Sequence, residues 1–270
     1  MPIPGGKNAS ENTRRAEQTA GDTRKKDEEK ATKLRERIWR EVRLILADIL
    51  QNMKPQHKDY ENVLNERYLH HYFSHRYQQR FTGVDLIGVD GIQQQEHGEE
   101  IALHPEWPTS KKASGIAGGM YAQNRPDPDG SAGHIDFAIG RYEEPWLGIE
   151  FKLSNGWPGE GVQFDLVKLL DPNNRFRLAV SFNVLIRDKL SGQHNGIEDA
   201  IKKAYKEAVT GAGSNQKTPR LWYIVVEVDP KERRIFLAKT DGPDKATEAP
   251  RITKLEGTAL VEFLHKEWKP

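Results

Sequence analysis

Two short segments in the middle of the chain carry the residue types that metal-dependent hydrolysis requires. The segments are 133–140 and 145–154, and both alternate apolar and polar residues with the period of two that is typical of half-buried strands. The connector between them has hairpin length, which predicts antiparallel pairing. Such pairing gathers Asp136, Glu150 and Lys152 on one surface of a sheet. Carboxylates and an amine that converge there can bind a hard divalent cation and hold a water molecule beside it.

The same pattern also fits a surface hairpin whose outer face carries an ordinary Glu–Lys pair. A solvated face is usually crowded with long charged or threonine side chains. Here the neighbours of the three polar residues are Ala138, Gly140 and Gly148. Small neighbours leave room for a ligand to approach the backbone. The composition of this surface therefore favours a binding site, with the solvated hairpin as the alternative.

Asp136, followed by Glu150-Phe151-Lys152 at the end of the next strand, resembles the signature of the PD-(D/E)XK nuclease superfamily, which includes many restriction and repair endonucleases. The resemblance implies an α/β fold with a restriction-endonuclease-like αβββαβ core, in which helices flank a central mixed sheet. It implies Mg²⁺ as the cofactor, with Mn²⁺ as a substitute, and Asp136, Glu150 and the backbone carbonyl of Phe151 as metal ligands. The implied activity is an endonuclease that hydrolyses nucleic-acid phosphodiesters, with DNA as the expected substrate, in prokaryotic restriction or defence.

Two predicted helices beside these strands supply further candidates. Glu66 lies within the apolar stripe of the helix predicted over 60–79, where a carboxylate must be paired, metal-bound or extended to solvent. In the resembled superfamily the helix before the sheet often contributes a Glu to the metal site, so Glu66 is the candidate there, against a salt bridge at the helix edge. Gln163 and Lys168 lie on the helix predicted over 162–170, where superfamily members often place auxiliary polar residues, against simple surface exposure.

Lys152 is the residue expected to act in the chemical step. It lies two residues from Glu150 and therefore on the same face of the strand. From there its amine can position the attacking water or stabilise the negative charge that develops. His71 and His75 also have metal-ligand spacing on one helical face, but partly exposed histidines of no special role are the preferred interpretation.

Three functions remain open at this level. The first is an active Mg²⁺-dependent nuclease. The second is a non-cleaving nucleic-acid-binding or interaction module on the same fold. The third is a structural protein whose hairpin face is simply solvated. Metal-dependent DNA binding without cleavage would identify the second, and a lack of metal affinity would favour the third.

Composition bounds these possibilities. The chain has 270 residues and no cysteine, which excludes disulfides and a Cys-ligated zinc site. No apolar run approaches the roughly 20 residues that span a bilayer, and the N-terminus has no apolar signal core, so no membrane association and a cytoplasmic location are expected. With 41 basic and 40 acidic residues the net charge is +1, so a nucleic-acid surface would have to come from local charge segregation.

The order of patterns along the chain predicts one folded unit. Residues 1–30 are charged and nearly free of large apolar side chains, which predicts a disordered tail. Residues 31–270 are expected to form a single domain, with the nuclease-like core at about 60–186, an extra N-terminal helix over 31–52 and a C-terminal hairpin over 221–239. Because one core provides one metal site, cutting both strands of DNA would favour a homodimer, and the N-terminal helix is a candidate interface.

Other elements are predicted from periodicity alone. A buried strand is expected over 177–186 and an amphipathic helix over 197–208. Further strands are expected over 84–89 and over 100–103, and the second of these, the first strand of the core, leads into 104–108. A closing helix is expected over 259–268.

Overall fold

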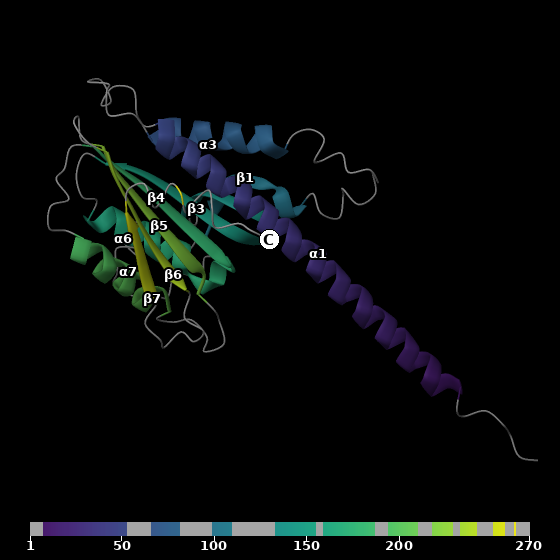
Figure 1. Ribbon diagram of the computed structural model, residues 1–270. Coiled ribbons are helices and arrows are strands. Elements are labelled where there is room, and N and C mark those ends of the chain that lie inside the picture. The colour runs from purple at the N-terminus through teal and green to yellow at the C-terminus, as the bar shows by residue number, and fades with distance from the viewer. Residues whose placement is uncertain are drawn as a thin grey trace, which may run out of the picture.

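Helices flank a mixed seven-stranded sheet in the computed structural model (Figure 1). The structure describes residues 8–52, 66–81, 99–109, 133–154, 159–186, 194–209, 218–228, 233–241, 251–256 and 262. The helices are α1 (Asn8–Asn52), α3 (Glu66–Phe81), α6 (Gly159–Leu170) and α7 (His194–Val209), with short 3₁₀ turns η1 (Glu99–Ile101) and η3 (Pro172–Asn174). The strands are β1 (Leu103–Pro108), β2 (His134–Arg141), β3 (Glu144–Ser154), β4 (Leu178–Ile186), β5 (Arg220–Val228), β6 (Arg233–Asp241) and β7 (Arg251–Glu256). The predicted α/β class is confirmed.

The strands lie in the sheet in the order in which they occur in the chain. The β1–β2 and β2–β3 pairs are antiparallel, β3, β4 and β5 are parallel, and β6 and β7 return to antiparallel pairing. Parallel neighbours need crossover connections, and α6 and α7 lie in the chain between β3 and β4 and between β4 and β5. β5 therefore continues the central sheet before pairing with β6 in the antiparallel arrangement predicted for the C-terminal hairpin.

The sheet carries an apolar core on each face. On one face α1 and α3 pack against Phe137, Phe151 and Phe182 and their neighbours. On the other face α6 and α7 pack against residues that include Tyr223 and Val225. Because β4 is buried on both faces, its sequence is a nearly continuous apolar run rather than an alternating one.

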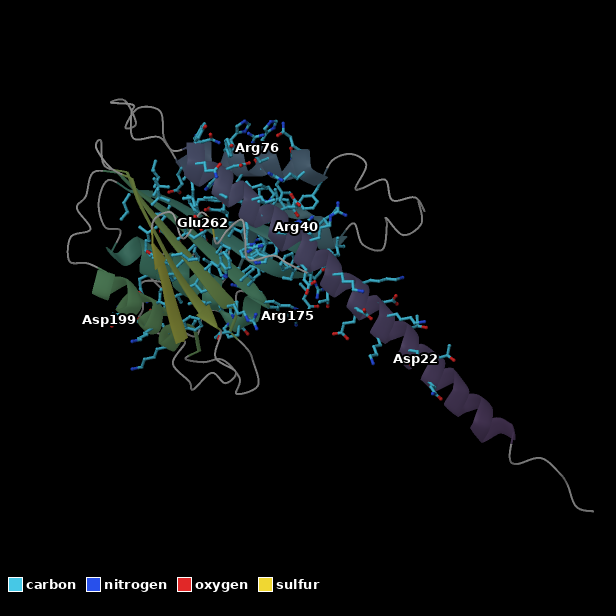
Figure 2. All side chains as sticks on the ribbon, in the orientation of Figure 1. Asp22, Arg40, Arg76, Arg175, Asp199 and Glu262 are labelled. Carbon is cyan, nitrogen blue, oxygen red and sulfur yellow. The ribbon has the colours of Figure 1, made fainter. Side chains whose placement is uncertain are left out.

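α1 is helical from Asn8, so the segment predicted to be a disordered tail differs from that prediction over 8–30. Every described side chain between residues 18 and 30 is nevertheless exposed, and Figure 1 shows this part of the helix projecting from the body. Figure 2 places Asp22 on the projecting part and Arg40 where α1 reaches the sheet. Once the following turns are docked, helix extension needs no new nucleus, and a 2.9 Å Lys33–Glu29 ion pair bridges successive turns.

The helix predicted over 31–52 is confirmed, and so is the apolar stripe of the helix predicted over 60–79 within its described residues. In α1 the stripe faces the chain's own sheet, with its central residues buried in the core: Ile38, Val42, Ile45 and Ile49. In α3 the buried residues recur at the predicted helical spacing: Leu69, Phe73, Tyr77 and Phe81. The predicted residues 60–65 of this second helix lie outside the described part of the chain.

Two edge elements differ from prediction. The first strand was predicted over 100–103 but occupies 103–108, and residues 99–101 form the turn η1. The prolines of β1 are compatible with a strand because β1 lies at the edge of the sheet. β7 was not predicted. The predicted strand over 84–89 lies outside the described residues, as does the closing helix except for Glu262, which is helical. Among the described residues, no helix is both long and apolar enough to cross a bilayer.

Candidate metal centre

β2 and β3 separate at the positions of the two predicted acidic ligands. Their pairing runs from Arg141–Glu144 to Phe137–Ile149, while β3 continues its pairing with β4 as far as Ser154. Beyond the Phe137–Ile149 pair, side-chain carboxylates accept hydrogen bonds from the N–H groups of β3 in place of a neighbouring strand. The Phe151 N–H donates to Asp136 Oδ2 at 2.7 Å, and the Leu153 N–H donates to Glu66 Oε2 at 3.2 Å. The separation therefore leaves one edge of β3 unpaired with β2. Carboxylates from β2 and α3 lie along this edge.

Asp136 is held from the α3 side by a histidine. His70 Nε2 lies 3.1 Å from Asp136 Oδ2, although the ring nitrogen is not aligned for a hydrogen bond. Burial lowers the pKa of His70, but its interaction with Asp136 and the charges of Glu66 and Glu106 outweigh burial and raise the pKa above its usual value. Burial likewise raises the pKa of Asp136, but His70 and the Phe151 N–H outweigh it and lower the pKa overall. The Asp136 carboxylate therefore stays ionised.

Glu150 is buried against α6 and paired with a lysine. Lys168 Nζ lies 2.6 Å from Glu150 Oε1 and 3.1 Å from Asp165 Oδ1, and it donates to the His134 carbonyl at 2.7 Å. Burial raises the pKa of Glu150, against the effect of Lys168. Burial lowers the pKa of Lys168, but the two carboxylates outweigh it and raise the pKa. A contact of 2.6 Å is typical of a charge-assisted hydrogen bond, so the pair consists of a Glu150 carboxylate and a Lys168 ammonium group.

Lys152 lies between the two helices. Its Nζ is 3.9 Å from Glu66 Oε2 on α3 and 3.8 Å from Asp165 Oδ2 on α6, and its side chain is about a third exposed. The structure thus brings Asp136, Glu150, Lys152 and Glu66 together. Lys168 joins them through Glu150.

The structure does not bring Gln163 into this group. Its side-chain amide donates instead to Glu207 Oε2 on α7 at 3.2 Å. Gly148, expected to leave room for a ligand, faces the ring of Phe176: a Cβ built on Gly148 would lie 2.7 Å from Phe176 Cε2. The small residue therefore makes room for packing at this position.

Sequence reasoning missed three members of the site: His70, Glu106 and Asp165. Ligand atoms of His70, Glu106 and Asp136 lie within 4.8 Å of one another. Glu106 has a φ of 50° and falls between the paired positions Pro105–Phe137 and Trp107–Ile135, opposite Asp136. The sequence gives no sign of this distortion. His70 could have been found, because it lies one helical turn from Glu66, the predicted site residue on the same helix.

His71 and His75, which have metal-ligand spacing in the sequence, do not belong to the cluster of His70, Glu106 and Asp136. His71 and His75 are exposed, and their rings stack on each other with centroids 6.0 Å apart. The interpretation of them as histidines without a special role stays a prediction.

The charges of the site favour a cation. Carboxylates of Asp136, Glu150, Glu66, Glu106 and Asp165 surround two lysines and one histidine. Oxygen ligands of this kind suit Mg²⁺ and Mn²⁺. Glu150 is only 4% exposed and the Asp136 side chain 14%. These two acidic residues are therefore not part of a solvated hairpin face.

Comparisons of the chain with family models, with curated proteins and with solved structures found no match.

Proposed function

We propose that the protein is a divalent-metal-dependent endonuclease that hydrolyses nucleic-acid phosphodiesters, with DNA as the substrate. The observation that carries this proposal is the opening between β2 and β3, where Asp136, Glu150 and Lys152 converge under α3 and α6. The order α3-β1-β2-β3-α6-β4, with two antiparallel pairs followed by a parallel one, is also the αβββαβ order of the PD-(D/E)XK nucleases that the Asp…Glu-x-Lys pattern resembles. Both observations support the restriction-endonuclease-like core.

The donor set at the opening fits a divalent cation. Asp136 and Glu150 are close enough for their carboxyl groups to interact, and they can supply hard oxygen ligands. In a strand the N–H and C=O of one residue point to the same edge. The Phe151 N–H donates to Asp136, so the Phe151 carbonyl also faces Asp136. His70 Nε2 is buried without a hydrogen-bond partner among the described residues, and an imidazole ligand would allow Mn²⁺ to replace Mg²⁺.

A bound Mg²⁺ or Mn²⁺ would supply charge to polarise the scissile phosphate and lower the pKa of a coordinated water. Hydrolysis joins the water oxygen to phosphorus and breaks one phosphorus–oxygen ester bond, with a proton passing to the departing oxygen. The Lys152 ammonium can hold the attacking water or stabilise the negative charge on the phosphoryl oxygens. Glu66 and Asp165 hold Lys152 between α3 and α6, and Lys168 fixes Glu150.

One observation favours a second candidate function. Glu150 is already neutralised by Lys168 at 2.6 Å, so a metal ion must share that carboxylate or displace the lysine. If neither occurs, the same site would bind nucleic acid without cutting it. The protein would then be a non-cleaving module on the same fold.

The test is incubation of the purified chain with plasmid, linear double-stranded and single-stranded substrates, of both DNA and RNA, in Mg²⁺, Mn²⁺ or EDTA. We expect DNA cleavage with either metal and none in EDTA, with an Asp136→Asn variant as the inactive control. Metal-dependent DNA binding without cleavage would favour the second candidate. Neither binding nor cleavage with any metal would contradict both. Measuring the molar mass with and without DNA tests the homodimer that double-strand cutting would favour.

A further inference from the structure

A buried polar strip continues from the candidate metal centre across the sheet beneath α6. In the parallel pairing of β3 with β4, Glu150 is the partner of Ser181 and Lys152 is the partner of Asn183. Register partners in adjacent strands project from the same face, so Asn183 lies beside the root of the Lys152 side chain. Asn183 is only 2% exposed, and such deep burial of an amide is unusual unless every polar atom has a partner.

Among the described residues, hydrogen-bond partners are found at only one end of the Asn183 amide. Its Nδ2 donates to Ser181 Oγ at 2.9 Å and approaches the Ile224 carbonyl of β5 at 3.4 Å. A peptide carbonyl can only accept, and this fixes which end of the amide is the nitrogen. Oδ1 is buried and accepts no hydrogen bond from the described residues. Because the oxygen and nitrogen of an amide diverge from Cγ, Oδ1 lies on the side of the amide away from the Ile224 carbonyl of β5.

The neighbouring Lys152 has hydrogen-bond donors that are not used by the described residues. An ammonium group carries three donors, yet Lys152 Nζ lies 3.8 and 3.9 Å from its two carboxylate neighbours, too far for hydrogen bonds. Within the described part of the chain, Lys152 Nζ donates no hydrogen bond. Among the described residues, a buried acceptor that receives no hydrogen bond and an ammonium group that donates none therefore occupy paired positions on one face.

We propose that Asn183 is a positioning residue for Lys152, and that its Oδ1 accepts a hydrogen bond from the Lys152 ammonium when a divalent cation occupies the carboxylates of the site. The consequence for cleavage rests on the proposed nuclease function, whereas the contact itself does not. Lysine has a flexible four-carbon chain, so one fixed acceptor narrows the positions that its ammonium samples. Ser181 and the Ile224 carbonyl hold the amide in the orientation that presents Oδ1.

The contact is tested by the reactivity of the lysine amine. Wild type and Asn183→Leu are treated with a limiting amine-acylating reagent in Mg²⁺, and modification of each lysine is read by mass spectrometry. We expect Lys152 to react several-fold faster in Asn183→Leu, because a hydrogen-bonded ammonium is protected. Lys33 and Lys203, whose side chains are 72% and 66% exposed, serve as internal controls and should react equally in both proteins. Equal reactivity of Lys152 in both proteins would overturn the proposal.

The effect on chemistry is tested by a double-mutant cycle in single-turnover cleavage. Asn183→Leu should slow cleavage roughly 10- to 100-fold, as expected for a misplaced catalytic group, with metal affinity unchanged. In a Lys152→Ala background the same substitution should cause no further loss, because Asn183 acts only through Lys152. An equal loss in both backgrounds would mean that Asn183 supports the fold instead, which contradicts the proposal.

The two measurements separate the two hypotheses. If wild type cuts no substrate, the proposed nuclease function fails, but the acylation result still decides the role of Asn183. If Asn183→Leu does not fold, the smaller Asn183→Ser is measured in the same way. Its shorter side chain cannot reach as far toward β3, so faster acylation of Lys152 is again expected, and an unchanged rate again overturns the proposal.

Discussion

The two central carboxylates hold their charges by different means. Asp136 is surrounded by a histidine and a backbone N–H, which lower its pKa against the effect of burial. Glu150 is buried, and its charge depends on one ammonium group, that of Lys168. Substitutions that remove the same charge from each should therefore differ in their effect on folding, although both should abolish metal-dependent cleavage.

Asp136→Asn should abolish cleavage and weaken Mg²⁺ binding with little loss of stability. The asparagine oxygen can still accept the Phe151 N–H, while the negative charge that a cation needs is gone. Calorimetric titration with Mg²⁺ and Mn²⁺, beside urea unfolding of the metal-free protein, measures both effects. Cleavage at the wild-type rate by Asp136→Asn would show that the metal centre is assigned to the wrong residue.

Glu150→Gln should destabilise the metal-free protein, whereas Asp136→Asn should not. Removing one partner of a buried ion pair costs about 3–5 kcal/mol when the other charge is left alone. The cost here should be lower, because Lys168 retains Asp165 and the His134 carbonyl. Comparison of the urea-unfolding midpoints of the two variants tests this. A Glu150→Gln variant as stable as wild type would mean that the Glu150–Lys168 pair contributes nothing to folding.

Lys152→Ala should separate chemistry from metal binding. An ammonium repels a cation, so its removal should leave Mg²⁺ affinity equal or higher. Single-turnover cleavage should fall by roughly 10²- to 10⁴-fold, the usual range for a positioned proton-transfer group. Lys152→Arg should not rescue the rate, since a guanidinium differs in shape and stays protonated. If metal binding and cleavage disappear together, Lys152 holds the carboxylates in place and its proposed role in the chemical step is wrong.

At the level of elements, β3 is positioned by a close contact with the segment that follows α6. The ring of Phe176 lies directly over Gly148, and it also packs against Trp107 of β1 with centroids 5.4 Å apart. Phe176 is 3% exposed, so the ring has little room to move. This contact connects the strand that carries Glu150 and Lys152 to the segment that follows the helix carrying Lys168.

Gly148→Ala should therefore destabilise the protein by about 1–3 kcal/mol, the usual cost of overpacking a core. The added methyl group would lie 2.7 to 2.9 Å from three ring atoms of Phe176. Gly21→Ala is the matched control, because nothing lies within 4 Å of a Cβ at that helical position. It should be neutral or stabilising by up to about 1 kcal/mol, since alanine is the better helix former. Urea unfolding of the two variants measures this difference. Equal stabilities of Gly148→Ala and Gly21→Ala would contradict the close packing of Phe176 on Gly148.

Over the whole molecule, α1 has two parts with different roles. The part from about residue 34 onward packs on the sheet. It is also held by Arg35, whose Nε and Nη2 donate to the carboxylate of Glu100 in η1, just before β1, at 2.8 and 3.0 Å. The part before it projects, with its described side chains exposed. Because the apolar stripe of α1 faces its own sheet, a dimer through that stripe would require the helix to undock.

Removal of residues 1–30 should leave the free energy of unfolding essentially unchanged, because that part buries none of its described side chains. The far-ultraviolet circular dichroism signal of helix should fall in proportion to the helical residues removed. Removal of residues 1–40 is the matched control, and it should destabilise the protein because it deletes Arg35 and Ile38. An unchanged helical signal in the shorter truncation would show that residues 8–30 are not helical in solution.

The sequence by itself determined most of the central helices and strands, and it placed Asp136, Glu150 and Lys152 near one another. Helical stripes and strand alternation are local properties, set by the geometry of the backbone over a few residues. Two alternating segments with a connector of hairpin length must also lie side by side. That was enough to predict α1 from residue 31 onward, most of α3, and the pair β2–β3, including the face that carries Glu150 and Lys152.

Only the tertiary structure decided which other residues reach the site. His70, Glu106 and Asp165 arrive on three different elements, and Gln163 turns to α7 although it shares a helix with Asp165 and Lys168. The separation of β2 from β3 beyond the Phe137–Ile149 pair is visible only in the folded chain, and no local pattern records it. Helical character before residue 31 was also missed, because it comes from extension of a docked helix rather than from apolar residues of its own.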